Sequence, residues 1–466
     1  MSRERLGSRL GFILLSAGCA IGCGNVWKFP WMAGQYGGGA FVVLYLIFLI
    51  ILGLPVMTME FAVGRASQAS PVKAYQSLEK PGQKWHLHGY VSLIANFLLM
   101  MFYTSVTGWI LYYFVSFVKG DMTGITDAQS VKLFDNMLAD PVIMVGFMAI
   151  VVILGFVILS FGVQKGLERV TKYMMIALLL LMIILAVNSF TLDGAKNGLN
   201  FYLKPDFTKI DGNVVVGAMN QAFFTLSLGI GSMAIFGSYL GKDRSLLGES
   251  VNIVVLDTFV AIVAGLIIFP ACFTFNVEPG AGPSLLFVTM AKVFNNMAGG
   301  HLWGSLFFLF MVFAAMSTVI AVFENILACI SELTGLSRIK TCVIGGIAVL
   351  VLSLPCALGF NLWSGFVPFA SGSSFLDLED FLVSNCMLPL GSLCYVLFCT
   401  SKKGWGFENY LAEVNTGKGL KLAKWTYYYI KFVLPIIILI LFFVGIANFA
   451  FADNFTIWGS IKGLVK

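Results

Sequence analysis

The sequence predicts an all-α membrane protein with eleven transmembrane helices. Of its 466 residues, 59% are hydrophobic and 11% are charged, whereas soluble proteins average about 45–50% and about 25%. The apolar residues form long stretches, each close to the roughly 20 residues that a helix needs to cross a bilayer. Two of these stretches are interrupted by glycines near the middle. A water-soluble domain is therefore excluded.

The eleven expected spans follow one another along the whole chain. Several are longer than a bilayer requires and must tilt or extend past the membrane. In order, they cover residues 11–34, 39–64, 90–118, 141–160, 167–189, 214–240, 249–275, 300–331, 340–357, 374–399 and 427–451.

The first span is expected to break near its middle. Gly18, Gly22 and Gly24 lie there, and each glycine lowers helix propensity by about 1 kcal/mol relative to alanine. A break at this depth frees carbonyls that can bind a cation and amides that can bind an anion. Such backbone is tolerated only where it is buried or lines a polar cavity. The alternative is a GxxxG face that only packs two helices closely.

The sixth span carries a second interruption at residues 225–231, TLSLGIG. A glycine-interrupted segment in each half of a membrane chain is the best sequence indicator of a transporter binding site. The pair of interruptions therefore favours a transport site over simple helix packing.

The orientation follows from the lysines and arginines. Most of the 29 lie in the loops and span ends on the side of the N-terminus, and the cytoplasmic side of a membrane protein carries the excess of positive charge. We expect a multi-pass protein of the cell inner (plasma) membrane, with a cytoplasmic N-terminus and an extracytoplasmic C-terminus. The formal charge of +6 reflects this asymmetry, and no nucleic-acid partner is expected. The basic loop 401–425 is interpreted as a solvated connection.

No catalytic or metal-binding constellation is evident. The nine cysteines lie in or beside apolar segments, where a buried small side chain is the simpler interpretation. The sequence lacks a nucleophilic residue and a general base in an arrangement typical of a catalytic site. An enzyme is therefore not expected.

Several motifs together resemble one known family. They are RLGFI at 9–13, GCGNVWKFP at 22–30, GGGAF at 37–41 and QAFFTLSLG at 221–229. The chain is similar to the neurotransmitter:sodium symporters with the LeuT fold, and among these to bacterial eleven-span amino-acid:sodium symporters. The similarity extends from the N-terminus to about residue 400.

The resemblance implies one transporter domain, 1–466, built from a 5+5 inverted repeat. The first repeat would be 1–189 and the second 214–400, with helices 1 and 6 broken and 427–451 as an additional helix. It further implies a secondary active transporter that moves a hydrophobic amino acid into the cell with two Na⁺ ions, by alternating access. The alternative is a non-transporting amino-acid sensor with the same binding site. The expected partners are the amino acid, sodium and the lipid bilayer, with no obligate protein partner.

The resemblance also implies two sodium sites. The first would use Ala20, Asn25, Thr225 and Asp257. The second would use the carbonyls of Gly18, Ile21 and Ala314 with the hydroxyls of Ser317 and Thr318. From the residues alone, serine and threonine in a membrane helix more often bond the preceding turn. An acid such as Asp257 inside a span is functional by default, although a locally paired carboxylate is the other interpretation.

The substrate site implied by the resemblance has a polar end and an apolar end. Relatives that carry biogenic amines have an aspartate where this chain has Gly22, so the pocket suits a substrate that brings its own carboxylate. The expected contacts are Ala20, Cys23, Gly24, Leu99, Tyr103, Phe224, Thr225, Ser227, Ile230, Thr318 and Val322.

The resemblance also implies an outer gate, a cytoplasmic gate and the anion dependence of transport. Lys28 with Asp380 would form the outer gate. The cytoplasmic gate would comprise Arg3, Ser238, Tyr239 and Glu332. Chloride-dependent relatives have a hydroxyl where this chain has Ala261, and Asp257 already supplies a negative charge there, so chloride-independent transport is expected.

Overall fold

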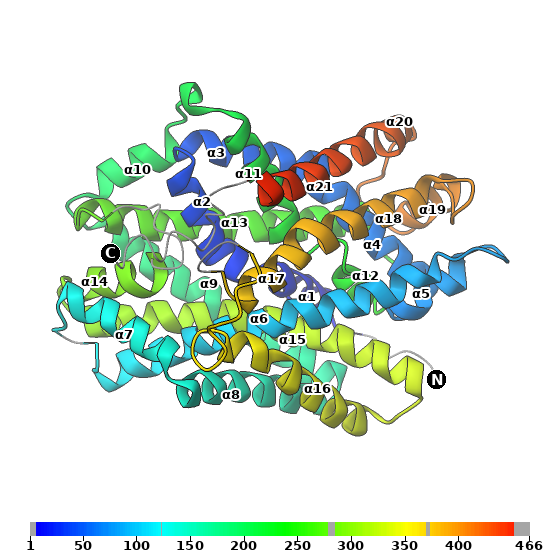
Figure 1. Cartoon of the computed structure of the whole chain (residues 1–466). Helices are drawn as coiled ribbons and strands as arrows, with labels where there is room; N and C mark the ends of the chain where they lie inside the picture. The colour runs from blue at the N-terminus through cyan, green and yellow to red at the C-terminus, as the bar shows by residue number, and fades with distance from the viewer. Residues whose placement is uncertain (1–5, 123, 278–284, 370–372, 452–466) are drawn as a thin grey trace.

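The computed structural model describes residues 6–122, 124–277, 285–369 and 373–451 as a bundle of helices (Figure 1). Within these ranges no β-strand forms, and one isolated bridge joins Arg244 to Lys418. Nine helical runs in the described ranges are long and apolar enough to cross a membrane. They are Gly39–Ser67, His86–Lys119, Pro141–Ser160, Val163–Phe190, Leu246–Thr274, Gly300–Thr334, Arg338–Leu358, Phe375–Thr400 and Thr426–Ala447.

Five of these nine runs are single helices and four contain a π-helical turn. The single helices are α6 (His86–Lys119), α8 (Pro141–Ser160), α13 (Leu246–Thr274), α15 (Gly300–Thr334) and α16 (Arg338–Leu358). The interrupted runs are α3 (Gly39–Phe48), η2 (Leu49–Gly53) and α4 (Leu54–Ser67); η3 (Val163–Glu168) and α9 (Arg169–Phe190); α17 (Phe375–Phe381), η6 (Leu382–Met387) and α18 (Leu388–Thr400); and α20 (Thr426–Tyr428), η7 (Tyr429–Val433) and α21 (Leu434–Phe451).

The other two predicted spans are the broken ones. The first consists of α1 (Arg9–Ala20), η1 (Gly24–Lys28) and α2 (Phe29–Gln35), and its two parts are bent by 55°. The second consists of α11 (Gly212–Thr225) and α12 (Ser232–Gly237), separated by the predicted interruption. All eleven predicted spans are therefore helical at the expected places, and the all-α membrane fold is confirmed.

Short helices connect the spans at the two ends of the bundle. At one end lie α5 (Pro71–Leu78) and α19 (Phe407–Val414), and at the other lie α7, α10 and α14 (Figure 1). The bounds of the remaining elements are Asp127–Ala139 for α7, Ala195–Leu203 for α10, Phe207–Lys209 for the 3₁₀ turn η4, Leu285–Thr289 for η5 and Met290–Asn295 for α14. The external connection 276–299, which resembles the re-entrant loop of the symporter family and could act as a lid, includes residues 278–284, which lie outside the described residues.

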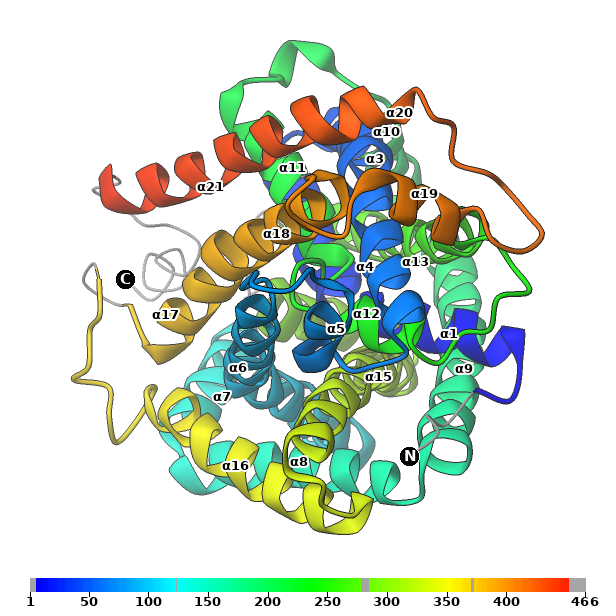
Figure 2. The same cartoon turned by 90° about the vertical axis from the view of Figure 1, so that its right-hand side faces the viewer.

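Burial separates an inner from an outer group of spans. In the most apolar 18-residue stretch of each span, 83% of α15 and 72% of α6 is buried inside the protein. The corresponding share is 33% in the spans that contain α9 and α21. In the end-on view, α21 lies at one edge of the bundle, and α8 and α16 lie at the opposite edge (Figure 2). The apolar side chains that the outer spans expose face the hydrocarbon of the bilayer.

The 401–425 connection differs from the expectation, because α19 within it is packed and not solvated. Its apolar residues Phe407, Tyr410, Leu411 and Val414 are buried, and they dock the segment on α4 and α18. The hydrophobic positions of this short helix were overlooked because basic residues and glycines dominate the rest of the loop.

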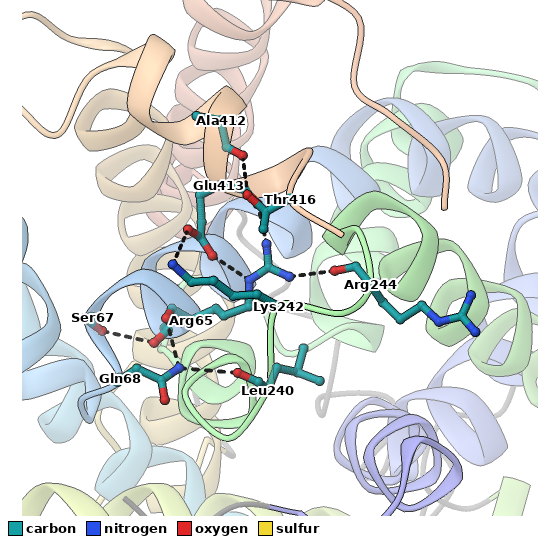
Figure 3. A network of polar contacts seen from close by, with 10 residues as sticks. Arg65, Ser67, Gln68, Leu240, Lys242, Arg244, Ala412, Glu413 and Thr416 are labelled. Carbon is teal, nitrogen blue, oxygen red and sulfur yellow. Dashed lines mark hydrogen bonds and ion pairs between the residues drawn. The ribbon is translucent and has the colours of Figure 1, made fainter. Parts of the chain in front are cut away.

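Arg65, inside the bundle, links the 401–425 segment to α4 and to the loop that contains Arg244 (Figure 3). The buried Arg65 guanidinium, at the end of α4, donates to Glu413 Oε1 at 2.5 Å and to the Arg244 carbonyl at 2.7 Å. It also donates to the Glu413 carbonyl. Backbone bonds between Lys418 and the 243–245 segment, both 2.9 Å long, complete the junction. The ends of α4, α12 and α13 are therefore held together through the 401–425 segment.

Arg65→Met is expected to destabilise the protein strongly. The change leaves the Glu413 carboxylate and two carbonyls without their donor, and breaking a buried ion pair costs about 3–5 kcal/mol. The matched control is Lys242→Met, because Lys242 Nζ lies 3.7 Å from Glu413 Oε2 but its side chain is 66% exposed. Such a pair contributes about 0–1 kcal/mol. Thermal unfolding of the purified variants compares them, and equal melting temperatures for the two would contradict this assignment.

Candidate functional site

Gly22, at the first helix break, lies where no side chain fits. Helix α1 ends at Ala20, and the next residue, Ile21, is extended at φ −74° and ψ 97°. A Cβ atom on Gly22 would lie 2.3 Å from the Tyr103 hydroxyl and 2.5 Å from Thr318 Oγ1, so only glycine allows these side chains to approach the broken backbone. A Cβ on Gly18 would lie 3.2 Å from Ser317 Cβ. Close packing at Gly18 and a true break therefore both occur.

The second break is held open by side chains from neighbouring spans. Between α11 and α12, Ser227 has φ 50° and Gly229 has φ 89°, which are left-handed conformations that end a helix. The buried carboxylate of Glu60 on α4 accepts the amide of Gly229 and, at 3.2 Å, that of Met233. The Asn96 amide donates to the Ile230 carbonyl at 2.7 Å.

Glu60 was not among the predicted site residues. It is an acid inside an apolar span, and the rule that singled out Asp257 would have singled out Glu60 as well. Its role differs, because it satisfies the backbone amides that the second break exposes.

The five residues of the predicted second sodium site lie together. The Thr318 hydroxyl is 3.2 Å from the Gly18 carbonyl oxygen and 3.3 Å from that of Ile21, whereas the Ser317 hydroxyl is 2.9 Å from the Ala314 carbonyl oxygen and 3.4 Å from that of Ile21. Both hydroxyls are buried. The Ser317 bond to Ala314 is the within-helix bond that a serine commonly makes. The contacts from Thr318 cross to the broken segment instead, so this cluster is more than local helix bonding.

Three residues of the predicted first sodium site also meet. The Asn25 amide donates to Asp257 Oδ1 at 2.8 Å, and the Thr225 hydroxyl lies 3.3 Å from Asp257 Oδ2. Tyr45 reaches the same carboxylate at 3.5 Å, and all four side chains are buried. Ala20, the fourth predicted ligand, lines the adjacent cavity. Oxygen atoms of carboxylate, amide and hydroxyl groups are the ligands that hard cations prefer.

A small cavity lies between the two breaks. Its volume is about 20 Å³, enough for one water molecule but not for an amino acid. The cavity is lined by Ala20, Gly22, Gly24, Leu99, Tyr103, Phe224, Ser227, Ile230, Thr318, Val383 and Leu388.

Most of the expected substrate contacts line this cavity, and three do not. Cys23 lies beside it, with its amide donating to the Tyr103 hydroxyl at 2.9 Å, Thr225 faces Asp257, and Val322 is buried in α15. Sequence reasoning missed Val383 and Leu388, which come from η6 and α18. Both are ordinary apolar residues of a membrane span, and no residue type or spacing distinguishes them from lipid-facing neighbours.

The predicted outer gate is not an ion pair in this structure. The Lys28 ammonium lies 3.7 Å from the centroid of the Phe224 ring, and Asp380 accepts the Ser384 hydroxyl at 2.7 Å. Among the described residues, no ion pair within 4.0 Å joins Lys28 to Asp380. A cation over an aromatic face is attracted to it, so Lys28 packs against Phe224, one of the residues that line the cavity.

The described residues that were predicted to form the cytoplasmic gate make hydrogen bonds to several different partners. Arg3 lies outside the described residues. Glu332 accepts the Ser70 amide and hydroxyl, and Ser238 donates to the Ile235 carbonyl. Tyr239 donates to Glu324 at 2.7 Å, which pairs with Arg338. The Glu324–Arg338 pair was not predicted.

Two broken helices that meet at a small cavity, with buried oxygen-bearing side chains beside it, inside a bundle of membrane-length helices are typical of a secondary active membrane transporter. The model of the "Sodium:neurotransmitter symporter family" matches residues 3–126 and 128–463. The chain therefore belongs to this family, as the motifs indicated.

Individual relatives agree with this assignment. An uncharacterised sodium-dependent transporter of Bacillus subtilis, YhdH, is 36% identical over 95% of this chain and 98% of its own length. A sodium-dependent transporter of Haemophilus influenzae is 33% identical over 94% and 97%. The crystal structure of MhsT in complex with L-phenylalanine superposes with a TM-score of 0.86 at 36% identity, covering 95% of this chain and 100% of MhsT.

These comparisons confirm the family, the LeuT-like fold and sodium-dependent transport of a small molecule by a multi-pass membrane protein. The protein is a transporter and not an enzyme.

Proposed function

We propose that this protein couples the entry of two sodium ions to the inward transport of one hydrophobic amino acid by alternating access. The observation that carries the proposal is the cavity at the meeting point of the two helix breaks, next to two clusters of buried oxygen-bearing side chains. The proposed topology places the N-terminus in the cytoplasm and the C-terminus outside the inner membrane. Segments 1–189 and 214–400 are the inverted repeats.

The residues around the cavity, which must move apart to admit an amino acid, offer complementary groups to both of its ends. The amides of Cys23 and Gly24 begin the second half of the broken helix, beside the Tyr103 hydroxyl, and a helix N-terminus favours a carboxylate. Carbonyls freed by the breaks can accept from the ammonium group. Position 22 is a glycine, so the protein has no acidic side chain there that could take the place of the substrate carboxylate.

The other end of the cavity favours an apolar side chain. Leu99, Ile230, Val383 and Leu388 line it, and the described lining includes no charged residue there. A relative with the same architecture was solved with L-phenylalanine, which supports an amino acid of this type. A charged side chain would lose its hydration in this cavity without gaining a partner.

Two sodium ions supply enough energy for concentrative uptake. Each charge that crosses 100 mV releases about 2.3 kcal/mol, and each tenfold concentration ratio adds about 1.4 kcal/mol. Two ions therefore contribute on the order of 7 kcal/mol. A tenfold accumulation of substrate requires about 1.4 kcal/mol, so the coupling leaves a wide margin.

Sodium-dependent binding of the twenty amino acids to the purified protein tests the proposal. Leucine, isoleucine, methionine or an aromatic amino acid should bind in sodium, and binding should be lost when potassium replaces sodium. Glycine, aspartate and lysine should bind at least tenfold more weakly, because they fill the apolar end poorly or bury an unpaired charge. Tight binding of aspartate or lysine would refute the hydrophobic specificity.

A further inference from the structure

A second, much larger cavity lies outside the transport site, beside the cytoplasmic end of the last span. Its volume is about 740 Å³. In both views α19 and the start of α20 lie next to each other at this end of the bundle (Figures 1 and 2). The cavity is lined by Lys80, Thr400, Lys402, Trp405, Gly406, Phe407, Glu408, Asn409, Lys424, Trp425, Tyr427 and Tyr428. The transport mechanism uses none of these residues.

Positive charge dominates the lining. Lys80, Lys402 and Lys424 contribute ammonium groups, and Glu408 contributes the opposing carboxylate. The Lys431 ammonium lies next to the cavity, where it donates to the Tyr427 hydroxyl at 2.5 Å. Ammonium groups gathered in this way favour an anionic ligand with several acceptor oxygens, such as a phosphate group.

The aromatic residues place the cavity at the membrane surface. Trp425 is 73% exposed and Tyr428 is 69% exposed, at the start of a membrane span. Tryptophan and tyrosine in that position characteristically lie at the level of the lipid headgroups. Below them the same span exposes Phe432, Ile436 and Ile440. A charged cavity is thus continuous with an apolar surface, which matches an amphiphile and not a small soluble anion.

The walls of the cavity are fixed by hydrogen bonds to the connecting loop. Lys80 Nζ donates to the Lys402 carbonyl at 2.9 Å, and next to the lining residues Trp85 Nε1 donates to the Lys403 carbonyl at 2.6 Å. The ring centroids of Phe407 and Tyr427 are 4.8 Å apart. A site that is already formed loses less entropy when a ligand binds. The Lys80 ammonium retains two further protons for a ligand.

We infer that this cavity binds the headgroup of an anionic phospholipid from the leaflet that faces this end of the bundle. Lys402 and Lys424 contact the phosphate, Trp425 and Tyr428 lie at the glycerol level, and the acyl chains follow the exposed apolar side chains of the last span. The proposed topology makes this the cytoplasmic leaflet, where basic pockets at the ends of spans bind anionic lipids.

Native mass spectrometry of the purified full-length protein tests the inference without measuring transport. The probes are dioleoyl phosphatidylglycerol, dioleoyl phosphatidylcholine and inorganic phosphate. The test variant is Lys402→Gln with Lys424→Gln. The matched control is Lys73→Gln with Lys84→Gln, two exposed lysines at the same end of the protein but outside the cavity.

We expect the unmodified protein and the control to bind phosphatidylglycerol equally, and the test variant to bind it roughly 30-fold more weakly. Trp425→Ala, which keeps every lysine, should also weaken binding. Equal binding of phosphatidylglycerol and phosphatidylcholine would overturn the inference, as would an unchanged affinity in the test variant. Inorganic phosphate bound as tightly as the lipid would assign the cavity to a soluble anion instead.

Discussion

Ser317→Ala combined with Thr318→Ala is expected to abolish sodium-stimulated uptake while the protein still folds. The two hydroxyls contact the carbonyls of Gly18 and Ile21 at the first helix break. Alanine leaves a sodium ion at that place with carbonyl ligands alone. Removal of a buried polar partner costs about 1–3 kcal/mol, so each lost ligand should weaken sodium binding by roughly tenfold or more.

The control uses a serine and a threonine on the same helix that bond only nearby backbone groups, outside the predicted sodium site. Ser305 donates to the His301 carbonyl and Thr334 donates to the Ile330 carbonyl, both at 2.7 Å. Ser305→Ala combined with Thr334→Ala should retain uptake and its sodium dependence. Uptake by each double variant is measured over a range of sodium concentrations in proteoliposomes. An unchanged sodium dependence in the Ser317 and Thr318 variant would rule out the second site.

We expect transport by the unmodified protein to be independent of chloride and transport by Asp257→Asn to be stimulated by chloride. Asp257 meets Asn25, Thr225 and Tyr45, and Ala261, one turn further along α13, offers no hydroxyl. A chloride ion about 4 Å from the carboxylate would be repelled by about 4 kcal/mol, which corresponds to roughly a thousandfold in affinity. Asparagine removes the repulsion and keeps the shape of the side chain.

Uptake in chloride and in gluconate measures the effect. The unmodified protein should transport equally in both anions, and Asp257→Asn should lose at least tenfold of its uptake in gluconate and recover part of it in chloride. Asp193→Asn, which neutralises an exposed carboxylate, serves as the control and should behave as the unmodified protein. Strong chloride dependence of the unmodified protein would refute this account of Asp257.

The positions of the spans and of both breaks could be predicted from sequence because each has a local cause. A bilayer-length apolar run has to be helical when no water is available to its backbone, and the glycines at 18–24 and 225–231 weaken the helix where polar backbone is required. The resemblance then assigned oxygen-bearing side chains to shared sites. The structure brings Ser317 and Thr318 to the first break, and Asn25 and Thr225 to Asp257.

The remaining features depend on tertiary contacts that leave no local pattern. Val383 and Leu388 line the cavity because η6 and α18 pack beside the second break, but an apolar residue in a span looks the same whether it faces lipid or substrate. Lys28 was assigned to Asp380 by analogy; its ammonium lies over the Phe224 ring, and Asp380 is the charged group that acts on it electrostatically. Helix α19 packs through four apolar residues inside a loop whose charge suggested exposure.

Gradient-driven uptake in proteoliposomes is the most direct test of the central claim that sodium entry drives the transport of a hydrophobic amino acid. Vesicles containing the purified protein are loaded with potassium and diluted into sodium medium with labelled L-leucine or L-phenylalanine. Internal substrate is expected to rise well above its external concentration, and a sodium ionophore is expected to return it to equilibrium. Equal uptake with potassium on both sides, or sodium-dependent binding without accumulation, would contradict it.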